Sequence, residues 1–181
     1  GAIQFLESDD AKDGRVGARA LVGLVLVKSG AKRDHPKILE AVEAIQKVVK
    51  DHDPAKIMLG DKVIYHVGLA VMLLVAHDPI GHRADIECLL KYLQLVQKDH
   101  GGWGYPNQES GDTSMTQYGV LSTWEATQAG FHIPPDSIEA VATWLLRTQD
   151  PNGGFGYQGI VSPTFTPVKQ DSTPLSLGAA G

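Results

Sequence analysis

Two kinds of apolar segment alternate along this chain, and their order limits the folds that it can adopt. Val16–Val27 and Val63–Ala76 are apolar on nearly every side, so helices formed from them need cover on most faces. Thr113–Gln128 is a third, more polar segment of this inner kind. Other segments carry a single apolar stripe at helical spacing, which is typical of a surface helix. The stripes are Ile38, Val42, Ile45 and Val49; Ile86, Leu89, Leu90, Leu93 and Val96; and Ile138, Val141 and Leu145. We therefore predict an all-α chain in which inner and outer helices alternate.

Aspartate–glycine pairs recur where the inner helices are expected to begin. The pairs, each seven residues apart, are Asp61–Gly68, Asp112–Gly119 and Asp171–Gly178. We expect each aspartate to cap a helix and each glycine to let two inner helices approach closely. The distance between pairs is typical of helical-hairpin repeats. The chain thus divides into repeats at residues 16–60, 61–111 and 112–160, with 1–15 ending a preceding repeat and 161–181 leading into a further inner helix.

The most specific motif joins each outer helix to the next inner one. It consists of a glutamine, a glycine pair that begins four residues later, and an aromatic residue. The two copies, 52 residues apart, are Gln97, Gly101, Gly102 and Trp103, and Gln149, Gly153, Gly154 and Phe155. Glycine supplies the positive φ that ends a helix. An amide both donates and accepts, so we expect the glutamine to tie carbonyls of one helix end to N–H groups of the next helix, with the aromatic ring covering the joint.

This motif resembles the glutamine–tryptophan turn of the terpene cyclase and protein prenyltransferase superfamily, which includes the squalene cyclases. The resemblance covers Phe5 to about Gly159 and is clearest in the two copies above. It implies an (α/α) toroid-type stack of helical hairpins, of which a closed ring has six. About three hairpins are present, so the resemblance implies half of a ring.

The resemblance also indicates where to look for catalysis. The cyclases protonate their isoprenoid substrate with an acid in an Asp-Xaa-Asp-Asp-Thr element. Residues 109–113 read Glu-Ser-Gly-Asp-Thr, so Asp112 and Thr113 match its last two positions, Glu109 replaces the first, and Gly111 stands where the proton donor would be. Protonating an alkene requires a strong, desolvated acid. We therefore expect a domain that is not catalytic as it stands, with Asp112 a helix cap, and that binds an apolar ligand or a partner protein.

An alternative is an active isoprenoid cyclase or transferase whose acid or metal site comes from Glu109 or from sequence outside this chain. A carbohydrate-active helical toroid is a third hypothesis, but no convincing carboxylate pair supports it. Under the ligand-binding hypothesis, the residues of the inner segments that could line a cavity are Tyr65, His66, Tyr118 and Trp124. Filling of the core is the competing interpretation of these side chains.

Composition excludes several other classes of protein. The chain has 16 basic and 21 acidic side chains and a net charge of −5, so it lacks the excess of positive charge that is typical of nucleic-acid-binding proteins. The single cysteine, Cys88, allows no internal disulfide. The histidines are scattered, and we expect most of them on the surface or in loops: His35, His52, His66, His77, His82, His100 and His132. We expect no bound metal and no cofactor. The longest apolar stretches are too short to cross a bilayer.

An open half ring would expose inner helices at both of its edges. Such apolar edges are seldom left uncovered in soluble proteins. We expect them to be covered by a second copy, by the remainder of a longer parent chain, or by a partner protein.

Overall fold

The computed structural model describes residues 2–8 and 13–171, and these residues form helices and loops without a strand. The helices are α1 (Ala2–Glu7), α2 (Val16–Lys28), α3 (Pro36–Val48), the 3₁₀ turn η1 (Pro54–Lys56), α4 (Val63–His77), α5 (Arg83–Val96), α6 (Thr113–Gln128) and α7 (Pro135–Arg147). The prediction of an all-α chain is confirmed. The further inner helix expected after residue 172 lies outside the described residues.

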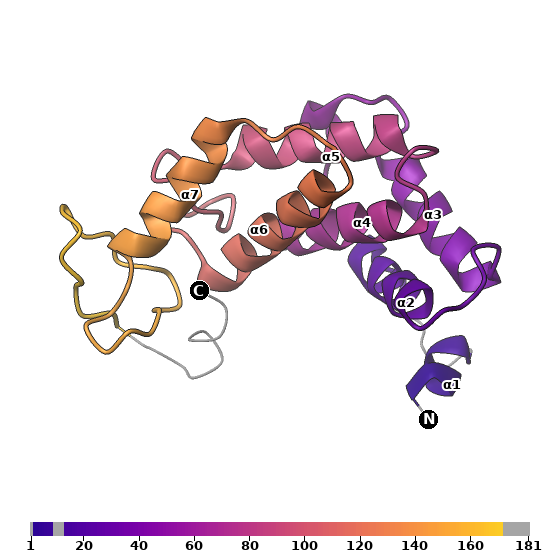
Figure 1. Ribbon diagram of the computed structural model, residues 1–181, viewed down its shortest axis with the longest axis horizontal. Helices are drawn as coiled ribbons and strands as arrows, with labels where there is room; N and C mark the ends of the chain where they lie inside the picture. Colours follow the sequence, from indigo (N-terminus) through magenta and orange to yellow (C-terminus); the bar gives the residue numbers. More distant parts are fainter. Residues whose placement is uncertain (1, 9–12, 172–181) are drawn as a thin grey trace.

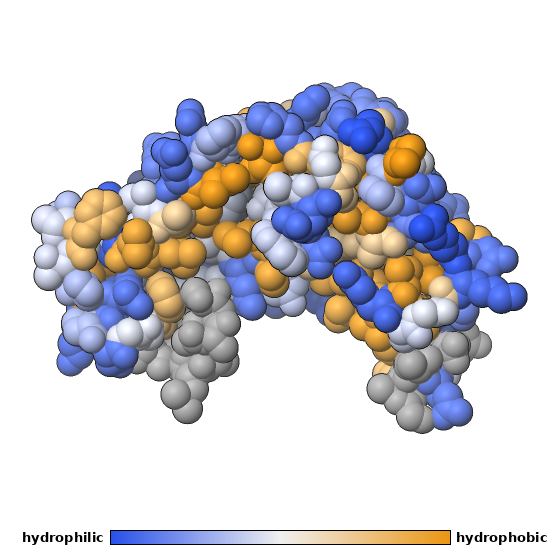
Figure 2. Space-filling view, in the orientation of Figure 1, coloured by the Kyte–Doolittle hydropathy of each residue, from blue (hydrophilic) through white to orange (hydrophobic). Residues whose placement is uncertain are grey.

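Inner and outer helices alternate as the apolar patterns predict. Helix α4 packs between α2 and α6, while α3 packs on α2 and α5 packs on α4 (Figure 1). Eleven of the 15 residues of α4 are buried, because this helix has neighbours on most sides. The space-filling view shows the resulting curvature, with a hollow below the inner helices α4 and α6 (Figure 2).

Glycines that recur at a constant spacing along the chain allow the inner helices to approach each other closely. A β-carbon on Gly17 of α2 would lie 2.2 Å from Nδ1 of His66 on α4, and one on Gly68 of α4 would lie 3.0 Å from the carbonyl oxygen of Tyr118 on α6. Gly17 and Gly68 are 51 residues apart, so these two contacts are equivalent and support a helical repeat. At Gly119, a β-carbon would meet the ring of Trp103 at 2.8 Å, and the inner helix expected next to it lies outside the described residues.

Of the aspartate caps predicted for the inner helices α4 and α6, the one on α6 forms and the one on α4 does not. Asp112 accepts a hydrogen bond from the backbone N–H of Met115 and caps α6. At α4, by contrast, the residue before the helix is Lys62, and no side chain caps the helix, so the prediction for Asp61 was wrong. One residue, Lys62, separates Asp61 from the helix, which places Asp61 outside the capping position. Asp171 ends the described part of the chain.

The two turn motifs have the same backbone structure. Gly101 and Gly153 have φ of 100° and 87°, the left-handed region that glycine adopts readily. The N–H of Lys98 donates to the carbonyl of Gly102 (3.0 Å), and 52 residues later the N–H of Asp150 donates to the carbonyl of Gly154 (2.9 Å). In each copy the glutamine amide nitrogen donates to the carbonyl of the first glycine. These distances are 2.7 Å for Gln97 and 3.2 Å for Gln149.

Gln97 connects the turn to the next outer helix, whereas an inner helix was expected. Its Nε2 donates to the carbonyl of Ser137 in α7 (3.0 Å), and its Oε1 accepts from the Ser137 hydroxyl (2.5 Å). The inner helix α6 is reached through Trp103 instead, because the backbone N–H of Trp103 donates to Oγ1 of Thr116 (2.9 Å). The indole N–H of Trp103 donates to the carbonyl of Leu93 near the end of α5, a group that has no partner within the helix (2.9 Å). The motif therefore joins three helices.

Helix α7 is positioned by this turn more than by α6, with which it makes little contact. The carbonyl oxygen of Ala140 in α7 would lie 2.1 Å from a β-carbon on Gly101, and Trp144 is fully buried beside Gly102 and Gly111. Thus the third outer helix depends on the first turn motif for its place.

Candidate functional site

Asp112 lies at the start of inner helix α6 and is fully buried. Its Oδ1 accepts hydrogen bonds from the backbone N–H of Met115 (2.8 Å) and from the hydroxyl of Ser114 (2.7 Å). The other carboxylate oxygen, Oδ2, is also buried and has no hydrogen-bond partner among the described residues. The expected role of Asp112 as a cap is confirmed, and one of its oxygens is left unused by that role.

Tyrosines from α4 and α6 meet next to this carboxylate. The Tyr65 and Ser114 hydroxyl oxygens are 2.6 Å apart, so a chain of hydroxyl groups leads from Tyr65 to Asp112. The ring of Tyr65 packs edge-to-face on Tyr118, with centroids 5.0 Å apart. Burial raises the pKa of the Tyr65 hydroxyl. The structure thus brings together two of the predicted cavity residues, Tyr65 and Tyr118.

Two further tyrosines, which the sequence analysis missed, come from the turn motifs. Tyr105 and Tyr157 lie at equivalent positions, 52 residues apart, and their hydroxyl oxygens are 3.3 Å from each other. The hydrogen bond with Tyr105, together with the negative charge of Asp112, raises the pKa of Tyr157. The backbone carbonyl of Tyr157 also accepts from the N–H of Thr113 (2.9 Å). The shared glycine–tyrosine pair that follows each turn motif was the signal that could have identified them.

Apolar side chains lie exposed on the inner helices. Leu21 and Val25 on α2 share a helix face with Lys28, and Leu121 on α6 shares a face with Glu125. The Lys28 ammonium lies 3.4 Å from Oε1 of Glu125, so these two faces are turned toward each other. We define the inner face of the domain as Leu21, Val25, Tyr65, Tyr118 and Leu121. It is a partly exposed apolar surface shared by three helices.

Trp124 and His66 have different environments from these tyrosines. Trp124 is 56% exposed, whereas Trp103 and Trp144 are 1% and 0% exposed. His66 lies at the contact of two inner helices, where its Nδ1 accepts from the backbone N–H of Gly17 at the start of α2 (3.2 Å). Burial, assisted by the positive charge of Arg15, lowers the pKa of His66. His66 thus helps to cap a helix, while Trp124 is open to solvent.

The position that the family resemblance assigns to the cyclase proton donor is Gly111, which carries no acid. A β-carbon on Gly111 would lie 2.5 Å from Cζ2 of Trp144, so the indole ring occupies the space of any side chain there. Glu109, the other catalytic candidate, is exposed in the loop between α5 and α6. Its surroundings therefore differ from the desolvated setting that an alkene-protonating acid requires.

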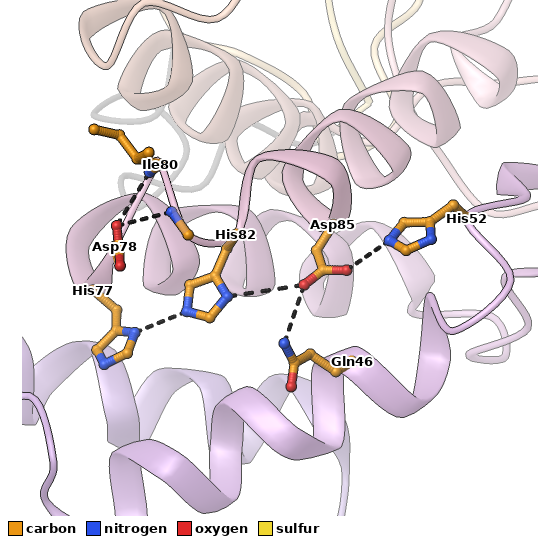
Figure 3. A network of polar contacts seen from close by, with 8 residues as sticks. Gln46, His52, His77, Asp78, Ile80, His82 and Asp85 are labelled. Atoms are coloured by element: carbon orange, nitrogen blue, oxygen red, sulfur yellow. Dashed lines mark hydrogen bonds and ion pairs between the residues drawn. The ribbon is translucent and has the colours of Figure 1, made fainter.

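A second polar cluster, also missed from the sequence, lies where α3, α4 and α5 meet (Figure 3). Its centre is a hydrogen bond between His77 Nδ1 and His82 Nε2 (2.9 Å). Asp85 continues the cluster, with His52 Nε2 3.0 Å from its Oδ1 and the Gln46 amide 3.3 Å from its Oδ2. Most histidines lie in loops or at helix ends as expected, and His77, a buried residue of α4, is an exception.

A groove of about 350 Å³ lies elsewhere, between α5 and the loop from α6 to α7. Leu90 and Phe131 form part of its wall, and the Arg83 guanidinium lies 5.0 Å from the centroid of the Phe131 ring. None of the residues predicted to line a cavity contributes to it.

The described part of the chain has no group of three or more His, Cys, Asp or Glu side chains placed to hold a metal ion. Cys88 is buried within α5, where burial raises the pKa of its thiol. None of the helices in the described ranges is both long and apolar enough to span a membrane.

Comparison with known proteins shows no relative of this chain. No family model matches the sequence, and no match was found among curated proteins or solved structures. The turn motifs and the alternating helices are thus the observations behind the resemblance to the terpene cyclase and prenyltransferase superfamily.

Proposed function

We propose that this chain is a toroid-type α/α repeat domain, similar to those of terpene cyclases and protein prenyltransferases, that binds an apolar ligand on its inner face. The main observation behind this proposal is that Leu21, Val25 and Leu121 are exposed. They lie on the sides of α2 and α6 that the ion pair between Lys28 and Glu125 joins. Leaving aliphatic side chains in water is unfavourable, and an apolar ligand that covered them would gain about 25 cal/mol for each Å² removed from water. Tyr65 and Tyr118 supply aromatic surface between them.

The same domain is proposed to be non-catalytic as it stands. The packing of Trp144 against Gly111 leaves no room for a proton donor at that position, and Glu109 is exposed. The alternative, an isoprenoid cyclase or transferase that uses Glu109 or sequence outside this chain, makes a different prediction. Incubation with squalene or a prenyl diphosphate would then give cyclised or transferred product that disappears in Glu109→Gln.

The outer edge of α6 supports the expectation of a partner. Trp124 of α6 is 56% exposed, and among the described residues the Gln149 amide makes only the bond within its own turn. We propose that further repeats, from a second copy, a longer parent chain or another protein, pack against this edge. Light scattering at micromolar concentration tests the first case, since a stable monomer excludes self-association.

Ligand binding is tested by tryptophan fluorescence, because Trp124 is the exposed one of the three tryptophans. Titration with farnesol, an isoprenoid alcohol, is expected to give a saturable change in emission that Trp124→Phe abolishes. Leu121→Gln should weaken binding by about tenfold, the effect of losing the burial of one aliphatic side chain.

Leu146→Gln is the matched control, because Leu146 is an exposed leucine on the outer helix α7. It should bind farnesol as the wild type does. Equal weakening by Leu121→Gln and Leu146→Gln, or no saturable change in the wild type, would contradict binding at the inner face.

A further inference from the structure

The hydrogen bonds of His77 and His82 restrict where their protons can lie. His77 Nε2 is 3.0 Å from the backbone carbonyl of Arg33, which can only accept, so this nitrogen carries a proton in every state of the bond. Neutral His77 then presents an unprotonated Nδ1 to His82, and His82 Nε2 must donate across the 2.9 Å contact. The two rings thus connect the α4–α5 turn to the α2–α3 loop.

One added proton fits this arrangement. With Nε2 as its donor, neutral His82 has a lone pair on Nδ1, which is buried without a hydrogen-bond partner and lies 3.9 Å from Oδ2 of Asp85. A proton on Nδ1 would place a positive charge next to that carboxylate. The pair can therefore hold one proton and keep the bond between the rings (Figure 3).

A second proton does not fit. If both rings were charged, an N–H on His77 Nδ1 and an N–H on His82 Nε2 would face each other across 2.9 Å, and neither could accept. The rings are also stacked, with centroids 5.2 Å apart, so two like charges would repel at short range.

We propose that His77 and His82 form an acid-sensitive clasp that joins the α4–α5 turn to the α2–α3 loop while the pair carries no more than one added proton, and that opens when both rings are protonated. This inference is independent of the proposed ligand binding, because none of these residues belongs to the inner face.

The charged groups around the pair come from each element packed against it. Asp85 of α5 and Asp78 of the turn carry negative charge, His52 follows α3, and Arg33 belongs to the α2–α3 loop. Asp78 also holds the turn itself, because its Oδ1 accepts from the N–H groups of Ile80 (3.2 Å) and Gly81 (3.0 Å). The two carboxylates favour a first proton on the pair but do not remove the clash of a second.

The sign of the pH effect follows from His82. Burial, and next the charge of His77, lower the pKa of His82 in the folded chain. An unfolded histidine has a pKa near 6.5, so below about pH 6.5 the unfolded or opened chain binds more protons than the clasped one. The clasped form is therefore favoured at neutral pH and loses up to about tenfold in its equilibrium constant per pH unit on acidification.

Histidine NMR on the wild-type chain tests the proposal directly. Ring ¹⁵N shifts of His77 and His82, followed from about pH 7.5 to about pH 5, should report one shared protonation while the rings stay in contact. Uptake of the second proton should coincide with faster hydrogen exchange at residues 80–82. If both rings titrate with separate midpoints above about pH 6 while exchange there is unchanged, the proposal is overturned.

His82→Gln provides the second test, since a glutamine amide can donate from the same ε position and does not titrate. After correction for intrinsic exchange rates, protection at residues 80–82 should fall at least about tenfold in the wild type between about pH 7 and about pH 5. It should fall much less in His82→Gln. His132→Gln, at an exposed histidine outside the cluster, should behave as the wild type does. An undiminished pH effect in His82→Gln overturns the proposal, and if this variant does not fold, the wild-type NMR titration decides alone.

Discussion

Trp144 of the outer helix α7 fills the space beside Gly111, where a β-carbon would lie 2.5 Å from its Cζ2 atom. The indole ring is fully buried and also lies over His100, with ring centroids 5.8 Å apart. A glycine at this position is thus required by packing, and the same packing excludes the acid that a cyclase would carry there.

Gly111→Ala should therefore destabilise the domain. The added methyl group must displace the Trp144 ring, and overpacking of this kind costs about 1–3 kcal/mol. Urea unfolding followed by circular dichroism measures the loss. Gly14→Ala is the control, because a β-carbon on Gly14 would have one neighbour among the described residues, at 4.0 Å, and Gly14 has no positive φ. Its effect should stay within about 0.5 kcal/mol. Equal effects of the two substitutions would contradict the packing argument.

The sequence predicts the local parts of this fold well, because they depend on neighbouring residues. The alternation of inner and outer helices follows from apolar periodicity, and the two turns follow from glycine at Gly101 and Gly153. The contact of Gln97 with Ser137 could not be predicted, because it joins residues 40 positions apart whose meeting depends on how α7 packs.

The candidate sites were predicted less completely, because they too depend on contacts between residues that are far apart in the sequence. Tyr65 and Tyr118 meet because Gly68 lets α4 approach α6, which the glycine spacing suggested. The histidine cluster depends instead on the shape of the turn between His77 and His82. His77 and His82 are five residues apart across a turn, a spacing that is typical of neither a helix face nor a metal site. The sequence therefore gives no indication that the two side chains meet.

The two glutamines of the turn motifs should contribute unequally to stability. Gln97 bonds both its own turn and Ser137 of α7, so Gln97→Ala removes three hydrogen bonds, to the Gly101 carbonyl and to the carbonyl and hydroxyl of Ser137. Gln149 makes only the bond within its turn, among the described residues. We expect losses of about 2–3 kcal/mol for Gln97→Ala and about 0.5–1 kcal/mol for Gln149→Ala in urea unfolding. Similar losses for both would show that the contact with α7 contributes nothing.

The aromatic residues of the two turns differ, and the difference suggests a rescue experiment. Trp103 donates its indole N–H to the carbonyl of Leu93, whereas in the second copy the hydroxyl of Thr148 donates to the carbonyl of Trp144 (2.9 Å) and lies 3.3 Å from that of Leu145. Trp103→Phe should cost about 1–3 kcal/mol, partly because the Leu93 carbonyl loses its partner.

Val96 occupies the position that corresponds to Thr148, 52 residues earlier. Adding Val96→Thr to Trp103→Phe should restore up to about 0.5–1 kcal/mol, since the new hydroxyl is expected within hydrogen-bond distance of the Leu93 carbonyl, as the Thr148 hydroxyl lies 3.3 Å from that of Leu145. In the wild-type background Val96→Thr should give no gain, because the carbonyl already has a partner. A double-mutant cycle of urea unfolding measures the coupling. Strict additivity would contradict the equivalence of the two turns.

The hydrogen-bonded tyrosines Tyr105 and Tyr157 allow the candidate site around Asp112 to be tested by pH titration. The hydrogen bond with Tyr105 and the negative charge of Asp112 both raise the pKa of Tyr157. Asp112→Asn keeps a side-chain oxygen that can cap α6 but removes the charge, so the helix should persist while the pKa of Tyr157 falls. Alkaline titration followed by tyrosinate absorption measures the change, and Tyr157→Phe assigns the transition by removing it. Tyr92 is the internal control, because burial alone raises its pKa and its titration should not move. An unchanged Tyr157 midpoint in Asp112→Asn would show that the carboxylate does not face the tyrosine hydroxyls.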